Sequence, residues 1–318
     1  MIPVDDILAA SRRLSEHLPA TPLLASPWLS DLAGADIRLK LESLQVTRSF
    51  KVRGALNALV RLAAQPSPPV VVTASAGNHG RAIAWAAERL GLDAVVFTPA
   101  GAPKAKVGPI ARHGADLRAV ASDYEDAERM AMAFARATGA TFISPYSHPD
   151  VIAGGGTVAL EIRDAWPEVE AIVVAIGGGG LISGIARLSK GVSPSIHVIG
   201  VEADVSCAFT AARRAGHIVA IEVGASLADG LGGNVEPGTL TWEYIRDLVD
   251  EVVTVSEADL RHSLRGLVAE EHLLAEGAGV AAVAAVASRR VALQGRKVAV
   301  VVSGANIDVT TLTAAIAM

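Results

Sequence analysis

The chain has 318 residues, which is long enough for two moderate domains or one large one. Hydrophobic residues make up 51% and charged residues 19%, a composition that supplies a buried core and argues against a disordered protein. The net charge of −5 argues against nucleic acid or an anionic membrane as a partner, because both require a basic face.

The N-terminal sequence and the cysteine content favour a cytoplasmic protein. Asp5 and Asp6 stand where a signal peptide would carry positive charge, and no apolar segment follows them. The single cysteine, Cys207, cannot form an internal disulfide, which fits a reducing compartment. The most apolar helical segment, residues 277–288, is too short to cross a bilayer. We therefore expect a cytoplasmic location and no membrane partner.

From residue 37 onward, short β-branched segments alternate with longer alanine-rich segments. Strands are expected at Ile37–Leu41, Val70–Ala74, Ala94–Thr98, Ala171–Ile176, Ile196–Glu202 and Lys297–Val302. Apolar residues at helical spacing predict helices that include Gly80–Leu90, Tyr124–Thr138 and Leu181–Lys190. This alternation predicts an α/β fold with parallel sheets covered by helices on both faces. The proline-rich segment 65–69 is a candidate crossing between two domains.

Lys51 lies where a helix is expected to begin. Ser49 is placed to cap a helix that starts at Phe50. In the first turn the helix dipole disfavours a cation, so the pKa of the Lys51 amine is expected to be lowered, as Schiff-base chemistry requires. A surface lysine with an extended side chain remains the alternative at this point.

Three further turns come directly after an expected strand and before an expected helix, where ligands bind in open α/β sheets. Residues 75–80, Ser-Ala-Gly-Asn-His-Gly, offer free amides suited to a carboxylate or phosphate, although an ordinary turn would look similar. The four glycines at 177–180 cost chain entropy and favour a backbone that wraps a phosphate. At residues 303–306, Ser-Gly-Ala-Asn, the hydroxyl could bond a ring nitrogen or cap a helix.

The four glycines also fit a loose dinucleotide-binding pattern. Glu202 ends the next expected strand, close to where that pattern places its acidic residue. A nicotinamide oxidoreductase therefore stays open at this point, although it would leave Lys51 and residues 75–79 unexplained.

Taken together, these segments resemble the threonine dehydratase and serine racemase family of pyridoxal-phosphate enzymes, which has the tryptophan-synthase-β-like fold. The matching segments run nearly end to end and include SFKVRGALNAL, SAGNHGRAIAWAA, HPDVIAGGGTVALEI, IGGGGLISGIA, VIGVEAD, ADGLGG and VVSGANID. The resemblance implies two domains, each an open, mostly parallel sheet flanked by helices, with the cofactor in the cleft between them. We expect a large cofactor-binding domain of residues 1–64 and 149–318. Residues 65–148 would form a small α/β domain that contributes the substrate-carboxylate loop.

The resemblance also implies roles for individual residues. Lys51 is similar to the lysine that binds pyridoxal 5'-phosphate as a Schiff base and then removes the α-proton of the substrate, and Phe50 to the residue packed beside the ring. Asn78 matches the residue that hydrogen-bonds the ring hydroxyl, and Ser303 matches the partner of the ring nitrogen. The phosphate cup corresponds to Gly177, Gly178, Gly179, Gly180 and Leu181. The positions near the substrate are Ser75, Ala76, Gly77, Asn78, His79 and Gly230.

The implied activity is that of a dehydratase, or ammonia-lyase, which converts an L-3-hydroxy amino acid to a 2-oxo acid and ammonia by α,β-elimination. Threonine or serine is the expected substrate, and 3-hydroxyaspartate or phenylserine is the alternative. Racemases of this family carry a second serine at the position of Ala76, so we expect elimination in preference to racemisation. A cofactor-binding regulator without activity is a further alternative, although no residue needed for catalysis is missing.

Metal binding and assembly follow from the same resemblance. Many relatives hold a divalent cation with a Glu and an Asp after the strand that ends at Glu202, but Ala208 stands where the Asp is expected. We therefore expect no metal site, with Glu202 only a remnant, and weak or no activation by magnesium. The family suggests a homodimer. Because the chain stops soon after residue 306, we also expect no isoleucine-sensitive regulatory domain.

Overall fold

Two separate sheets organise the protein, and the computed structural model describes residues 1–317. The larger sheet has the order β1-β2-β10-β7-β8-β9, in which only β1 and β2 pair antiparallel. Its strands are β1 (Leu23–Ala25), β2 (Asp36–Leu41), β7 (Ala171–Ala175), β8 (His197–Ala203), β9 (Glu251–Val255) and β10 (Lys297–Val302). The smaller sheet has the order β5-β4-β3-β6 and is parallel throughout. Its strands are β3 (Val71–Ala74), β4 (Ala94–Pro99), β5 (Asp116–Ala121) and β6 (Thr141–Phe142).

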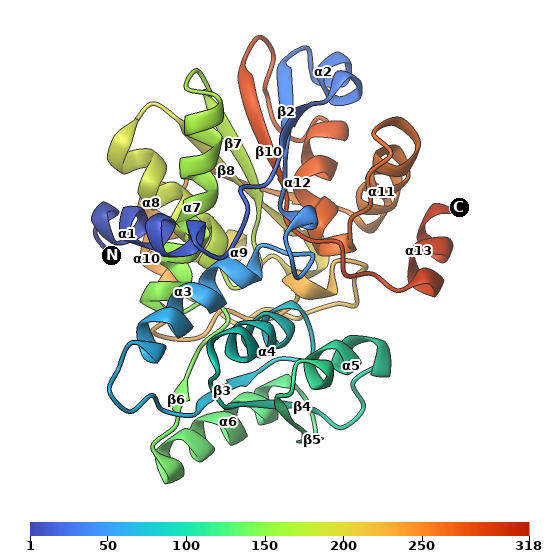
Figure 1. Ribbon diagram of the computed structural model, residues 1–318. Helices are drawn as coiled ribbons and strands as arrows, with labels where there is room; N and C mark the ends of the chain where they lie inside the picture. Colours follow the sequence, from blue (N-terminus) through green and yellow to red (C-terminus); the bar gives the residue numbers. More distant parts are fainter. Residues whose placement is uncertain (318) are drawn as a thin grey trace.

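Helices cover both faces of each sheet, and the small sheet with its helices lies below the large one in Figure 1. The helices before residue 140 are α1 (Val4–Ser15), α2 (Pro27–Ala33), α3 (Lys51–Ala63), α4 (Asn78–Leu90), α5 (Lys104–Arg112) and α6 (Tyr124–Thr138). Those after it are α7 (Pro149–Ala165), α8 (Gly180–Val192), α9 (Ala208–Ala215), α10 (Thr241–Leu248), α11 (Glu257–Glu270), α12 (Gly277–Ala287) and α13 (Val309–Ile316). Within residues 1–317, no helix has both the length and the apolar character needed to cross a membrane.

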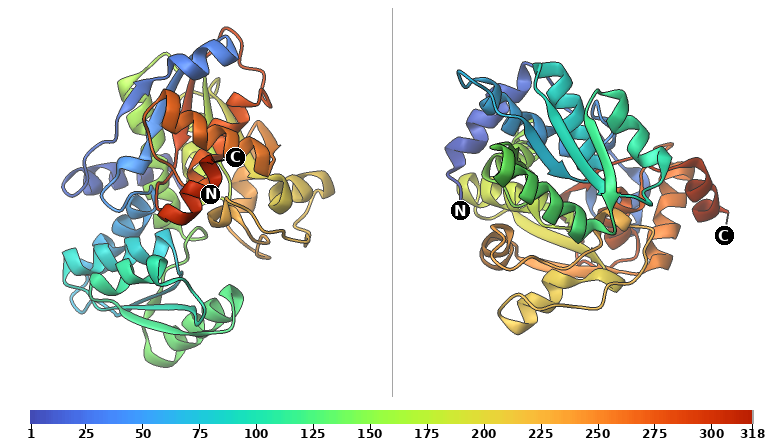
Figure 2. Two further views of the ribbon diagram at one scale, coloured as in Figure 1. Left: turned by 90° about the vertical axis from the view of Figure 1, so that its right-hand side faces the viewer. Right: turned by 90° about the horizontal axis from the view of Figure 1, so that it is seen from below.

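The alternation of side chains along the central strands divides the core of the large sheet into two layers. On β7, Ile172 and Val174 pack with helices α1, α7, α8, α9 and α10, whereas Ala171 and Val173 pack with α2, α11 and α12 on the other face. Both faces are therefore buried, as near-continuous apolar strands require. In the view from below, α4 and α6 flank the small sheet (Figure 2).

The predicted α/β fold with two parallel sheets flanked by helices is confirmed. The six predicted strands are present as β2, β3, β4, β7, β8 and β10, with ends that differ by at most one residue. The sequence analysis missed β1, β5, β6 and β9. These strands lie at sheet edges, where β5 and β9 are only partly buried and β1 and β6 have three and two residues.

Helix α7 contacts both α3 and α8 through its glycines. A Cβ atom on Gly154 would lie 2.5 Å from the carbonyl oxygen of Arg53 in α3. A Cβ atom on Gly156 would lie 2.9 Å from the carbonyl oxygen of Gly184 in α8. Only hydrogen at these positions allows such close backbone approach, so α7 fixes α3, which begins at Lys51, relative to α8.

A buried ion cluster joins the same elements to the large sheet. Arg53, whose side chain is 1% exposed, pairs through Nε with Glu42 at 2.7 Å and through Nη1 with Glu161 at 2.7 Å. Lys40 also pairs with Glu161, at 2.5 Å. Two cations thus face two carboxylates, which compensates the cost of removing these charges from water.

We expect the substitution Arg53→Met to lower the free energy of unfolding by about 3–5 kcal/mol, because it leaves two buried carboxylates facing one cation. Urea denaturation measures this change. Arg61→Met is the control, because Arg61 pairs with Asp150 from a side chain that is 56% exposed and should change stability by less than about 1 kcal/mol. Equal losses in the two variants would contradict a stabilising role for the cluster.

Candidate active site

A cavity of about 1460 Å³ lies at the carboxyl ends of β3, β7 and β10, between residues of the two sheets. It is lined by every residue that the sequence analysis assigned to cofactor or substrate: Phe50, Lys51, Ser75, Ala76, Gly77, Asn78, His79, Gly177, Gly178, Gly179, Gly180, Leu181, Gly230 and Ser303. Segments that are more than 250 residues apart in the chain thus meet in one place, as expected for the carboxyl edges of α/β sheets.

Lys51 is the first residue of α3, but the predicted cap by Ser49 is wrong. Phe50 occupies the cap position, and the Ser49 hydroxyl is buried with no hydrogen-bond partner among residues 1–317. The chain is held there by its backbone, because Ser49 forms a bridge with Gly304 and the Phe50 amide donates to the Ser303 carbonyl at 3.0 Å. Pairing with the segment after β10 therefore places Lys51.

The Lys51 amine is enclosed by the cavity walls. Its Nζ donates to the Pro145 carbonyl at 2.8 Å and lies 5.2 Å from the centre of the Phe50 ring. Burial lowers the pKa of Lys51 to about 8, and the nearby Glu276 carboxylate opposes this shift. The predicted direction is confirmed, but the main cause is desolvation rather than the helix dipole.

The loop of residues 177–181 exposes its backbone to the cavity. Gly179 adopts a left-handed conformation with φ +86°, and α8 begins at the next residue. A Cβ atom on Gly178 would lie 2.3 Å from the Tyr146 ring. No backbone acceptor within residues 1–317 takes a hydrogen bond from the amides of this loop, which leaves them available at a positive helix terminus.

The loop of residues 75–79 leads into α4, which begins at Asn78. The Gly77 amide donates to the Ser75 hydroxyl at 3.2 Å, and Ala76 contributes only a methyl group to the cavity wall. The His79 ring lies 3.2 Å from the Ile143 carbonyl, and burial lowers its pKa to about 3. His79 is therefore neutral and held by the small sheet.

The sequence analysis missed Glu276, which precedes α12 and lines the cavity. Asn78 Nδ2 donates to Glu276 Oε1 at 2.6 Å, and burial raises the pKa of Glu276 to about 7. The available signal was an acidic residue directly before the apolar helix GAGVAAVAAVA. An acid in that position ordinarily caps the helix, but this side chain makes no cap hydrogen bond.

A second group that the sequence analysis missed joins the two sides of the cavity. Glu128 on α6 faces Glu236, from the segment before α10, and Tyr124 and Tyr146 lie beside them. Burial, followed by the hydrogen bond and the charge of Glu236, raises the pKa of Glu128 to about 8. Glu128 therefore keeps its proton near neutral pH.

Glu202, the candidate remnant of a metal site, has another use. Its carboxylate accepts hydrogen bonds from the Phe209 and Thr210 amides, both at 2.8 Å, and from the Thr210 hydroxyl at 2.6 Å. It thus caps α9 from the end of β8. Among residues 1–317, no three His, Cys, Asp or Glu side chains are grouped so as to hold a metal ion.

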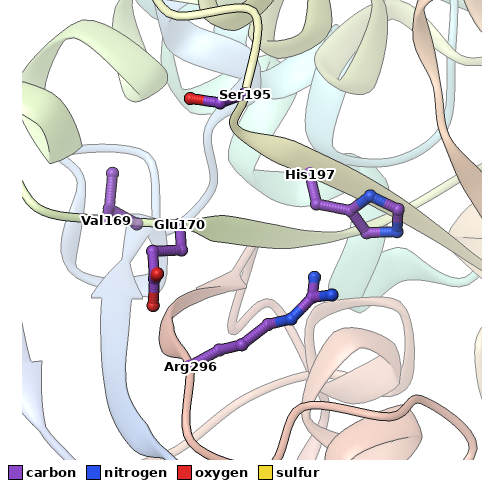
Figure 3. Close-up of a pocket in the computed structure, with 5 residues that line it drawn as sticks. All are labelled: Val169, Glu170, Ser195, His197 and Arg296. Carbon is purple, nitrogen blue, oxygen red and sulfur yellow. The ribbon is translucent and has the colours of Figure 1, made fainter.

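A smaller recess of about 380 Å³ lies at the opposite edge of the large sheet. It is lined by Val169, Glu170, Ser195, His197 and Arg296, near the amino ends of β7, β8 and β10 (Figure 3). The Glu170 carboxylate is already used, since it accepts a hydrogen bond from the Lys297 amide at 2.8 Å. None of the sequence-predicted site residues lies there, so the large cavity is the candidate active site.

The Glu128–Glu236 pair predicts a pH dependence of stability. Because the folded protein keeps a proton on Glu128 that the unfolded chain loses, stability falls as pH rises from the ordinary pKa of 4.5 to about 8. Glu236→Gln removes one carboxylate and should make this fall smaller. Urea midpoints between pH 5 and pH 8.5 test this, with the exposed Glu222→Gln as control. An unchanged pH profile in Glu236→Gln would contradict the contribution of Glu236 to the raised pKa of Glu128.

Comparison with known proteins places the chain in a family. The model of the family described as "Pyridoxal-phosphate dependent enzyme" matches residues 14–304. L-threonine ammonia-lyase of Thermotoga maritima is 40% identical over 309 residues, which cover 97% of this chain and 77% of that protein. The catabolic L-threonine dehydratase TdcB of Escherichia coli is 38% identical over 311 residues, 97% of this chain and 94% of that protein. The structure of maize serine racemase matches with a TM-score of 0.90 and 31% identity, over 99% of this chain and 96% of that one. The chain therefore belongs to the pyridoxal-phosphate dependent enzyme family.

Proposed function

We propose that the protein is an L-threonine ammonia-lyase that uses pyridoxal 5'-phosphate to convert threonine, and more generally an L-3-hydroxy amino acid, to a 2-oxo acid and ammonia. The relatives named for this activity support the proposal, because they match almost the whole chain. The observation that carries it is the enclosed Lys51 amine, which lies in one cavity with a phosphate-type glycine loop and a carboxylate-type loop.

The residues of the cavity fit the cofactor. A Lys51 pKa of about 8 leaves part of the amine unprotonated near neutral pH, as condensation with an aldehyde requires. The free amides of residues 177–181 suit a phosphate, and a side chain on Gly178 would collide with the Tyr146 ring, so the loop keeps this path only with glycine there. The Ser303 hydroxyl, buried 3.5 Å from the Ala278 carbonyl, would face the ring nitrogen as a neutral group. Asn78 would bond the ring hydroxyl, and Phe50 would pack beside the ring.

The chain's own residues divide the chemistry between binding and proton transfer. When bound, the cofactor supplies an electron sink for the charge that develops at the substrate α-carbon. Lys51 takes the α-proton, since its amine has a lowered pKa and faces the cavity. The amides and hydroxyl of residues 75–79 hold the substrate carboxylate at the start of α4. Loss of the 3-hydroxyl group and hydrolysis of the resulting enamine yield the 2-oxo acid and ammonia.

Ala76 decides between elimination and racemisation in this proposal. A racemase needs a second acid–base group to reprotonate the α-carbon from the other face, and Ala76 supplies only a methyl group in that loop. A dehydratase for another 3-hydroxy amino acid, such as 3-hydroxyaspartate or phenylserine, remains the second candidate, because a cavity of about 1460 Å³ accommodates a larger side chain than that of threonine.

The proposal includes a domain division, a homodimer and a cytoplasmic location. The division into residues 1–64 with 149–318 and residues 65–148 is supported by the sheets, since every strand of the small sheet lies between residues 71 and 142. The homodimer rests on the family to which the chain belongs, and Leu24, Leu44 and Val46, which are 49%, 46% and 43% exposed, are apolar side chains available for such a contact. The single cysteine, which cannot form an internal disulfide, supports the cytoplasm.

Lys51→Ala should reduce ammonia release from L-threonine at least about a thousandfold, because it removes both the covalent attachment point and the base. The visible absorbance of the bound cofactor should disappear as well. Lys190→Ala is the control, because Lys190 pairs with Asp250 and does not line the cavity. A coloured and active Lys51→Ala variant would refute the assignment.

With L-serine, the protein should form pyruvate with little or no D-serine, and Ala76→Ser should raise the share of D-serine by restoring a hydroxyl on the second face. Chiral chromatography and a pyruvate assay measure the two products in the same reaction. If the unmodified protein made D-serine as fast as pyruvate, Ala76 would not control the outcome.

A further inference from the structure

A line of polar side chains runs from α4 through the segment after β10 and ends at Glu276. Arg81 Nη1 donates to Asn306 Oδ1. Asn306 Nδ2 donates to the Thr47 carbonyl at 2.9 Å and to Asn78 Oδ1 at 2.6 Å. Asn78 Nδ2 donates to Glu276 Oε1 at 2.6 Å. The line thus connects three segments that are distant in the sequence.

The hydrogen bonds of this line have only one possible direction. An arginine only donates and a backbone carbonyl only accepts, so Asn306 must turn Oδ1 to Arg81 and Nδ2 to Thr47. The second N–H of Asn306 then requires an acceptor, which is Asn78 Oδ1. The neighbours of Asn78 therefore set the orientation of its amide.

This orientation determines what Asn78 can offer a ligand. Its Oδ1 is engaged by Asn306, and one of its two N–H groups is engaged by Glu276. The group left for the cavity is one N–H donor. A donor favours an oxygen in its ionised form over the same oxygen carrying a proton.

Resting on the proposed function, we propose that Glu276 and Asn306 are positioning residues that hold Asn78 as a hydrogen-bond donor, so that the ring oxygen of the bound cofactor stays ionised. The two residues act from opposite ends of the Asn78 amide. Loss of either one frees the amide to turn and to present its oxygen to the cavity instead.

The start of α12 and the neighbouring Gly304 leave the Glu276 carboxylate free to bond Asn78. Its side chain leaves the amides at the start of α12 uncapped, although a carboxylate there could accept from them. Its own amide donates to the Gly304 carbonyl at 3.0 Å, and a Cβ atom on Gly304 would lie 2.3 Å from Glu276 Oε1. A glycine is therefore required beside the carboxylate. A carboxylate placed only to stabilise α12 would cap it.

Four charged groups face the Glu276 carboxylate and contribute to any pH profile. They are Lys51 on α3, Arg81 on α4, Lys106 on α5 and Asp229 in the short helix η3 (Asp229–Leu231). Burial is the largest influence on Glu276, ahead of these charges, and it favours the neutral acid. The Asn78 hydrogen bond favours the carboxylate, so the two residues stabilise each other's orientation.

The test is a pH titration of the absorbance spectrum of the cofactor-loaded protein without substrate. In Glu276→Met, which removes the acceptor, and in Asn306→Ala, the band of the protonated ring oxygen should grow at neutral pH. Its transition should move up by about one pH unit, a tenfold change in the ratio of the two forms.

Glu202→Met is the matched control, since the pKa of Glu202 is likewise raised by burial but its carboxylate caps α9 outside the cavity. Its spectrum should follow that of the unmodified protein. Two variants at opposite ends of Asn78 keep the test decisive if one of them does not fold. Unchanged spectra in both would overturn this inference while leaving the proposed function intact, whereas an unmodified protein that binds no cofactor would overturn the proposed function itself.

Discussion

The active site depends on the close backbone contact of α7 with α3 and α8. Gly154 and Gly156 leave space only for hydrogen where the neighbouring helices pass, so no side chain separates the three helices. Helix α3 begins with Lys51, and α8 begins directly after the turn at Gly179. One packing constraint therefore sets the amine and the glycine loop at a common cavity. The ion cluster around Arg53 ties α3 and α7 to β2 through Lys40, and none of its side chains lines the cavity.

Burial then gives the groups in this cavity unusual protonation. It lowers the pKa of Lys51 to about 8 and raises that of Glu276 to about 7. Both the amine and the acid therefore change protonation near neutral pH. The same burial lowers the pKa of His79 to about 3, so this ring is too weak a base to compete with Lys51 for the proton. A lysine that is partly unprotonated at neutral pH is suited both to bind an aldehyde and to accept a proton from carbon. The enclosure of the site thus supplies reactivity that no single residue has in water.

Sequence reasoning succeeded where the information was local. The β-branched segments identified six buried strands, and the turns after β3, β7 and β10 identified the loops that line the cavity.

Sequence reasoning failed where contacts between distant segments decide the role of a residue. Ser49 looked like a helix cap, but pairing with Gly304 turned its hydroxyl into the protein. Glu276 was not predicted, because only the fold brings Asn78 to it from about 200 residues away. The Glu128–Glu236 pair likewise exists only because the two sides of the cavity meet.

The central claim is that the enclosed Lys51 amine works with a bound pyridoxal phosphate to eliminate the 3-hydroxyl group of threonine. The most direct test is to add L-threonine to the purified, cofactor-loaded protein and to follow ammonia, 2-oxo acid and the visible cofactor absorbance together. The account predicts that ammonia and the 2-oxo acid appear in equal amounts while the absorbance changes on mixing. A protein that binds the cofactor but releases no ammonia from threonine, serine or another 3-hydroxy amino acid would contradict it.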